Sequence, residues 1–242
     1  MGGPSAATIE WLLDVAPAAW LGARLHPFFS DTGSVIPPGF GAYARLFHPV
    51  EAVQLGDRRH RWADVARETG RIVHPEMQFH MISRPIGEPP PDGYQPGVGP
   101  SWGSLPLPER RALAEVLGPA TTTPQRCWFC LWEGFGGVDD PGVAERVRLP
   151  RRDYLFYTGA LEMALVQPPG LDGLDQSPNL WWPDDRAWCV ATDIDYAWTY
   201  VGGTRRLIDS LLEDERFEIL PAKLTDRPFY DSDLLNAALD VG

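Results

Sequence analysis

The chain has 242 residues and a formal net charge of −12, and 44% of its residues are hydrophobic. This length and composition are typical of a folded globular protein and exclude a disordered chain. The acidity is uneven, because residues 161–242 hold 16 acidic and six basic side chains. Nucleic-acid binding needs a basic face, so this third disfavours a nucleic acid as partner. It favours a basic protein partner or a divalent metal.

The sequence also bears on the cellular compartment. No window approaches the roughly 18 uncharged apolar residues of a membrane span, so we expect no membrane association. The first residues lack the basic segment of a signal peptide and carry Glu10 and Asp14. Three cysteines are an odd number, which fits a reducing compartment. We therefore expect a cytoplasmic protein.

The N-terminal half predicts short elements separated by turns. Apolar spacing predicts a helix over residues 7–23, kinked or ended by Pro17. Residues 43–53 have strand composition, and residues 61–69 predict a helix capped by Gly70. Alternating apolar residues predict a half-buried strand over residues 75–83.

The middle of the chain begins with a long loop rich in Pro and Gly, residues 87–103, where we expect a lid or a subdomain boundary. A helix follows, with Pro108 in its first turn and Gly118 at its end. Residues 126–132 and 153–157 predict strands. Residues 161–166 either continue the sheet or begin a helix.

The C-terminal third predicts a βαβ-like unit. It consists of a strand over residues 187–194, a turn at Gly202-Gly203, a helix from Thr204 to about Glu215, and a strand over residues 217–220. Strands and helices mix without regular alternation, which favours an α+β fold over a doubly wound α/β fold. We expect one domain over residues 1–242, with a mixed sheet, flanking helices and long loops.

Three segments carry a family resemblance: CWFCLWEGFGG at residues 127–137, SPNLWWPDDRAWCVATDIDY at residues 177–196, and VGGTRRLIDSLL at residues 201–212. In them the chain resembles a family of proteins of unassigned function from high-GC Gram-positive bacteria, over most of residues 105–225. The resemblance implies a bacterial cytoplasmic protein. It implies no catalytic residue.

Cysteines and histidines do not form a complete metal motif. Cys127 and Cys130 make one CxxC, whereas a structural zinc site needs four ligands. On a strand these two thiols would point to opposite faces, so we predict buried thiols and no zinc. His48, His74 and His80 match no helical metal motif, and a metal or acid–base role for them is the lesser alternative.

An enzyme is the second hypothesis for function. Asp193 and Asp195 lie two residues apart after a predicted strand, and such carboxylates can share a face and hold Mg²⁺ or Mn²⁺. Arg205 and Arg206 open a predicted helix, where they could clamp an anionic group of a small-molecule substrate. No nucleophile motif such as GxSxG accompanies them. The observation that bears most directly on this hypothesis is whether Asp193, Asp195 and Arg205 line a single cleft.

The leading hypothesis is a non-catalytic binding protein, similar in role to an immunity protein or antitoxin, without a cofactor. Its acidic, Trp-rich C-terminal third would engage a basic protein partner, with oligomeric state left open. Trp and Arg dominate interface energetics, so the predicted contact residues are Trp181, Trp182, Asp184, Asp185, Trp198, Arg205 and Arg206. We predict that Trp188 is buried and that one or both of Trp181 and Trp182 is partly exposed.

Overall fold

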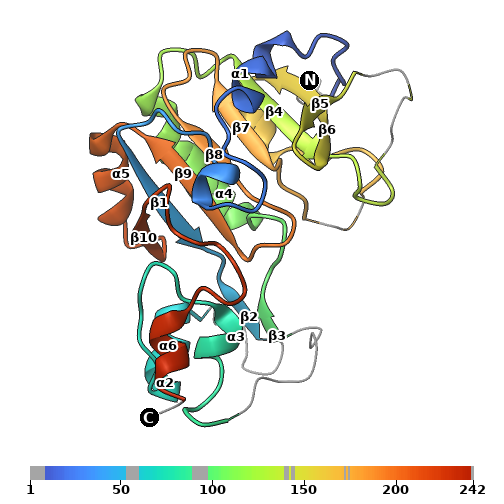
Figure 1. Ribbon diagram of the computed structural model, residues 1–242. Helices are drawn as coiled ribbons and strands as arrows, with labels where there is room; N and C mark the ends of the chain where they lie inside the picture. The colour runs from blue at the N-terminus through green and yellow to red at the C-terminus, as the bar shows by residue number, and fades with distance from the viewer. Residues whose placement is uncertain are drawn as a thin grey trace, which may run out of the picture.

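An eight-stranded sheet forms the centre of the protein (Figure 1). The computed structural model describes residues 9–52, 60–88, 98–138, 142, 145–171, 173 and 175–240. All neighbouring strands of the sheet pair antiparallel. In order across the sheet they are β10 (Ile219–Ala222), β1 (Ala42–Phe47), β9 (Trp198–Gly203), β8 (Cys189–Ala191), β7 (Leu180–Pro183), β4 (Cys127–Trp132), β6 (Arg152–Gly159) and β5 (Val147–Leu149).

Both faces of the sheet are covered, and each carries its own hydrophobic core. Helices α4 (Leu107–Leu117) and α5 (Arg205–Leu212), with the 3-10 turn η4 (Leu161–Leu165), pack on one face. The other face is covered by the N-terminal segment, which includes η1 (Ala16–Ala18), α1 (Ala19–Gly22) and η2 (Thr32–Ser34). A further 3-10 turn, η3 (Gly118–Ala120), follows α4. Central strands are therefore buried on both sides.

A smaller lobe lies below the sheet in Figure 1. It contains α2 (Trp62–Thr69), α3 (Phe79–Ile82), α6 (Leu234–Ala238) and the ribbon formed by β2 (Val50–Ala52) and β3 (Val98–Pro100). Trp62 and Met77 are fully buried and belong to the same hydrophobic cluster as the adjoining sheet face. The lobe and the sheet thus share one core. The expected boundary at 87–103 falls partly on residues 89–97, outside the described residues.

The α+β prediction is confirmed, and the C-terminal unit is a split version of the one expected. Strands β9 and β10 run parallel, because each pairs antiparallel with β1, which lies between them. Helix α5 connects them, and Thr204 caps it by accepting a hydrogen bond from the Leu207 amide. The first strand of the unit is β9, whereas residues 187–194 yield only the short β8.

Gly202 and Gly203 do not turn the chain, contrary to the prediction, because they end β9. A Cβ atom on Gly203 would lie 2.7 Å from the Leu207 side chain, and one on Gly202 would lie 2.7 Å from Phe40. These distances are too short for a real side chain. The glycines therefore allow α5 and the Phe40 loop to approach the sheet closely.

Two further predictions are wrong in the N-terminal half. Within the predicted helix over residues 7–23, the described part begins at residue 9, and of residues 9–23 only 16–22 are helical. Pro17 lies in the first turn of η1 instead of ending a helix. The preceding segment is held by the sheet, since the Leu12 amide donates to the Phe156 carbonyl. Residues 79–82 form α3, not a strand, because the amide of Gln78 before it donates to the Asp233 carboxylate. In both places a backbone amide donates a hydrogen bond to a residue far away in sequence, and the local pattern does not predict this contact.

Candidate functional site

The predicted tryptophan surface is buried. Trp181 and Trp182 are fully buried and Trp198 is only 3% exposed, so the prediction of a partly exposed Trp pair is wrong. The pair lies in β7, a central strand, so Trp181 joins one core and Trp182 the other. Trp188 is buried as predicted, and its indole N–H donates to the Leu117 carbonyl at 3.1 Å. These rings therefore pack in the core and stabilise the fold.

Asp184 and Asp185 follow β7 at the surface and hold the loop beside them. Asp184 accepts a hydrogen bond from the Trp128 indole at 2.9 Å. Asp185 accepts from the amide and hydroxyl of Thr122 and from the hydroxyl of Thr121. Although burial alone would raise the pKa of Asp185, these hydrogen bonds lower it. Both carboxylates therefore have a clear structural role.

The four side chains of the enzyme hypothesis do not share a cleft. Asp193 and Asp195 precede β9, whereas Arg205 and Arg206 follow it, so the length of the strand, roughly 20 Å, separates the pairs. Both Asp carboxylates bind one guanidinium instead, that of Arg152, at 3.2 Å and 2.7 Å. No group of three or more His, Cys, Asp or Glu side chains is placed to hold a metal within the described part of the chain.

The remaining motif residues are also dispersed. Cys127 and Cys130 lie on opposite faces of the sheet, as predicted, and both are buried free thiols. Burial raises the pKa of Cys127 to about 12, so it stays a thiol at neutral pH. His74 bonds to Asp233, and His80 stacks on Tyr230. The side chains of His74 and His80 therefore have separate structural partners.

A pocket of about 30 Å³ opens beside Asp193. It lies between the N-terminal segment, the turn joining β5 to β6, and the adjacent ends of β7 and β8. Apolar walls come from Leu25, Phe28 and Leu149, and polar groups from Tyr154 and Asp193. The Asp193–Arg152 pair thus sits in a hollow of the surface and not on a flat face.

A chain of buried hydrogen bonds leads inward from this pocket. His48 is fully buried, and its Nδ1 lies 2.8 Å from the Ser101 carbonyl, which can only accept a hydrogen bond. The Nε2 atom therefore accepts from the Thr199 hydroxyl at 2.9 Å. Thr199 lies 2.7 Å from the hydroxyl of Thr192, a residue that lines the pocket. The geometry requires a neutral imidazole, and burial lowers the pKa of His48 to about 4.

This buried histidine predicts a specific pH dependence of stability. The unfolded imidazole has a pKa near 6.5, so the unfolded state binds a proton first as the pH falls. The stabilisation is complete above about pH 6.5 and is lost as the pH falls from 6.5 toward 4. Between pH 7.5 and pH 5.5 we expect the free energy of unfolding of the unsubstituted protein to fall by about 1.3 kcal/mol more than that of the His48→Gln variant. Urea unfolding at the two pH values measures both. Parallel curves for the two proteins would contradict the assignment.

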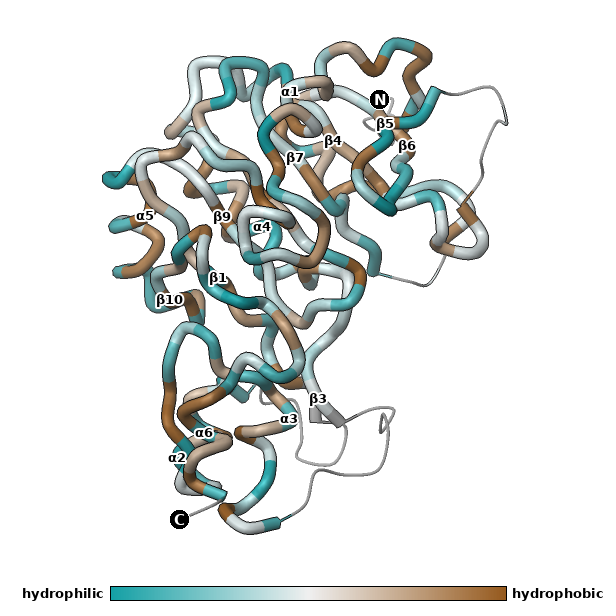
Figure 2. Tube along the Cα trace, viewed as in Figure 1, coloured by the Kyte–Doolittle hydropathy of each residue, from teal (hydrophilic) through white to brown (hydrophobic). Residues whose placement is uncertain are grey.

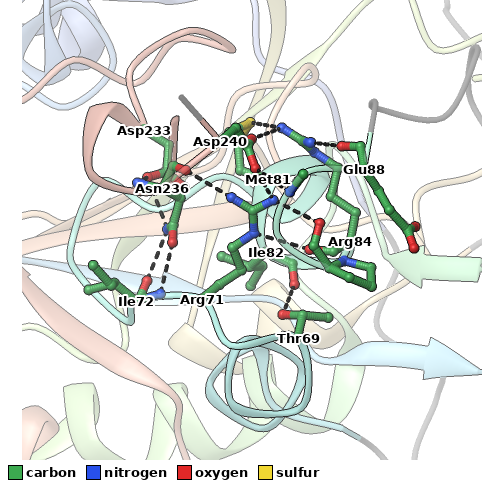
Figure 3. Close-up of polar contacts among 12 residues, drawn as sticks. Thr69, Arg71, Ile72, Met81, Ile82, Arg84, Glu88, Asp233, Asn236 and Asp240 are labelled. Carbon is green, nitrogen blue, oxygen red and sulfur yellow. Dashed lines mark hydrogen bonds and ion pairs between the residues drawn. The ribbon is translucent and has the colours of Figure 1, made fainter. Parts of the chain in front are cut away.

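Figure 3 shows a network of polar contacts that holds helix α6 against the other segments of the lobe. The Arg71 side chain is fully buried and donates to the carbonyls of Arg84, Pro85 and Asn236 and to the Asp240 carboxylate. Arg84 bonds to the other oxygen of Asp240. The Asn236 side chain exchanges two hydrogen bonds with the backbone of Ile72. The last turn of the chain is thus held by buried polar groups.

Helix α6 consequently has its polar side inside and its apolar side outside. Asp233 and Asn236 are buried, whereas Leu234 and Leu235 are 67% and 52% exposed. Three further apolar side chains are exposed: Ile72, whose backbone bonds to Asn236, Val73, which follows it in sequence, and Tyr230, which lies four residues before Leu234. We name these five apolar residues, Ile72, Val73, Tyr230, Leu234 and Leu235, the C-terminal surface. Figure 2 shows hydrophobic stretches of the lower lobe at this end of the molecule.

Sequence reasoning missed the C-terminal surface, although a signal was present. Asp233, Asn236 and Asp240 recur at helical spacing, with two leucines between the first two. An ordinary surface helix would bury the leucines, so the pattern did not mark a site. No family model, curated protein or solved structure matches this chain. Function must therefore be inferred from the residues themselves.

Proposed function

We propose that the protein is a non-catalytic binding protein that engages a basic protein partner through the C-terminal surface. The observation that carries this proposal is the inverted orientation of α6, with Asn236 buried and Leu234 and Leu235 in solvent. Single exposed leucines are common, but several exposed apolar side chains gathered around one helix are typical of an interaction site. Burying each leucine against a partner would contribute about 1.5–3 kcal/mol.

The polar network supports a surface that is prepared before binding. The buried donors and acceptors of the network hold α6 in one orientation. The leucines of α6 therefore lose little conformational freedom when a partner binds. Preorganisation reduces the entropic cost of association. A helix held only by its own leucines would have to bury them instead.

The charge of the chain supports a basic partner over a second copy. Residues 161–242 carry 16 acidic and six basic side chains, and the whole chain has a net charge of −12. Two copies would repel each other, whereas a cationic partner would be attracted and steered. Apolar anchors would then hold the complex, and surrounding carboxylates such as Asp231 would accelerate its formation.

A site-specific photo-crosslinker in the host cell tests this proposal. With p-benzoylphenylalanine at Leu234, we expect one dominant adduct with a basic protein. Leu235→Asp should reduce that adduct at least tenfold without changing the melting temperature, because Leu235 is already 52% exposed. Purified partner should associate more slowly in 0.5 M salt, because charge steering is screened.

The matched control is the same crosslinker at Leu13, which is 65% exposed but belongs to the N-terminal segment. Equal adducts from both positions would indicate nonspecific hydrophobic capture and would contradict the proposal. An adduct with a second copy of the chain, together with a dimer in sedimentation, would replace the basic partner by self-association. Absence of any adduct from Leu234 would also contradict it.

A further inference from the structure

We propose that the pocket beside Asp193 binds a primary ammonium group. This site is distinct from the C-terminal surface and independent of the function proposed for it. The hollow lies at the ends of β7 and β8, and its volume is about 30 Å³. A single water needs at least about 10–15 Å³, so the pocket admits a head group of a few atoms.

Two polar groups in the pocket remain available for a ligand. Tyr154 lines the pocket and is only 6% exposed, and its hydroxyl has no hydrogen-bond partner among the described residues. Asp193 also lines it, and its Oδ1 atom accepts from Arg152 and from the Asp195 amide. The second oxygen, Oδ2, has no such bond within the described structure. Most of the Tyr154 side chain is buried, but its hydroxyl is not among the buried atoms that lack a partner, so it faces the accessible space of the pocket and can bond to a ligand there.

The other polar side chains around the pocket are already bonded. Asn179 accepts from the Trp132 amide and donates to the Thr192 carbonyl. The Ser34 hydroxyl donates to the Asp31 carbonyl at 2.6 Å. The Thr192 hydroxyl is bonded to that of Thr199. A ligand is therefore directed toward Tyr154 and Asp193.

The local charge selects a cation over an anion. One guanidinium, that of Arg152, lies between the carboxylates of Asp193 and Asp195, so these three groups have a net charge of −1. The Nη2 atom of Arg152 is bonded to both carboxylates and its Nε atom is inaccessible to solvent. An anion could therefore approach this guanidinium only through Nη1, where it would also meet the excess carboxylate charge. An ammonium group has three donors, which can bond to Asp193 Oδ2 and to the Tyr154 oxygen.

The walls of the pocket fit the carbon atoms attached to such a group. Leu25, Phe28 and Leu149 provide apolar surface beside the two polar groups. Methylenes next to an ammonium pack well on such surfaces while the charge stays paired. A free alkylamine and the lysine side chain of a polypeptide share this chemistry, and both are candidate sources.

Titration of the full chain with n-butylamine at pH 7, followed by NMR, tests the proposal. We expect saturable shifts of Tyr154 and its neighbours, at least tenfold weaker binding to Asp193→Asn, and weaker binding to Tyr154→Phe. Asp195→Asn is the matched control, because it removes an equal charge from the same Arg152 partner but Asp195 does not line the pocket. It should weaken binding by less than threefold. Asp193→Asn retains the Oδ1 acceptor, and an unchanged melting temperature would verify its fold.

Three outcomes would overturn the proposal: equal losses for both Asp variants, equal binding of n-butanol, or preferential binding of acetate. Nα-acetyl-lysine methylamide distinguishes the sources. Tenfold tighter binding of this compound than of n-butylamine would assign the site to a lysine side chain. Equal or weaker binding would assign it to a free amine.

Discussion

Replacing Arg71 with methionine is expected to lower the free energy of unfolding by about 3–5 kcal/mol. The Arg71 side chain is fully buried and donates to three backbone carbonyls and to Asp240. Methionine fills much of the space but donates no hydrogen bond, so these acceptors lose their partner away from water. The loss should be concentrated in the lobe, because Arg71 joins α6 to Arg84 and Pro85, which follow α3 (Figure 3).

Urea unfolding measures this loss, and hydrogen exchange locates it. We expect faster exchange in residues 233–240 than in the central strands. Arg67→Met in α2 is the control, because Arg67 makes an exposed ion pair with Asp64 at 2.8 Å. That pair contributes at most about 1 kcal/mol. Similar destabilisation by both substitutions would show that Arg71 does not have the anchoring role assigned to it.

This network illustrates what sequence reasoning could not supply. Arg71 and Asn236 are 165 residues apart, and their contact depends on the complete path of the chain. Composition identified Arg71 only as one of 20 arginines, a residue type that is mostly exposed in folded proteins. A buried arginine that bonds to backbone carbonyls leaves no pattern in neighbouring residues. The exposure of Leu234 and Leu235 follows from that contact, so it could not be predicted from the sequence either.

Local sequence signals predicted an element correctly where the group that stabilises it lies nearby in the sequence. Thr204 was predicted to cap a helix, and its hydroxyl accepts from the Leu207 amide. Gly70 was predicted to end α2, and it has a left-handed φ of 75°, which favours glycine. The strand β4 was recognised from its run of large apolar residues. Each of these features depends on residues close together in sequence.

The central strands show the opposite case. Neither β9 nor β7, whose tryptophans lie between Pro178 and Pro183, was predicted as a strand. A strand covered on both faces needs no alternation of apolar and polar residues, so the two-residue periodicity that would predict a strand is absent from its sequence. The same burial explains why the predicted contact residues Trp181 and Trp198 are core residues. Their abundance indicated a dense core, not an interface.

Replacing Trp181 with alanine is accordingly expected to lower the free energy of unfolding by about 3–5 kcal/mol. Its ring is fully buried, stacks on Phe129 at 6.4 Å and meets the edge of Trp188 at 5.5 Å. Removing the indole leaves a cavity between α4, α5 and the sheet, which close packing cannot fill without strain. The loss should match that of Trp188→Ala, because both rings belong to the same core.

Trp102→Ala provides the control for this substitution, since it removes the same side chain from a position that is 51% exposed. We expect it to change the free energy of unfolding by no more than about 0.5 kcal/mol. Urea unfolding should be monitored by circular dichroism, because each variant lacks one tryptophan and its fluorescence would differ for that reason alone. A small effect of Trp181→Ala, comparable to that of Trp102→Ala, would mean that the ring is not packed. It would restore Trp181 as a residue that can contact a partner.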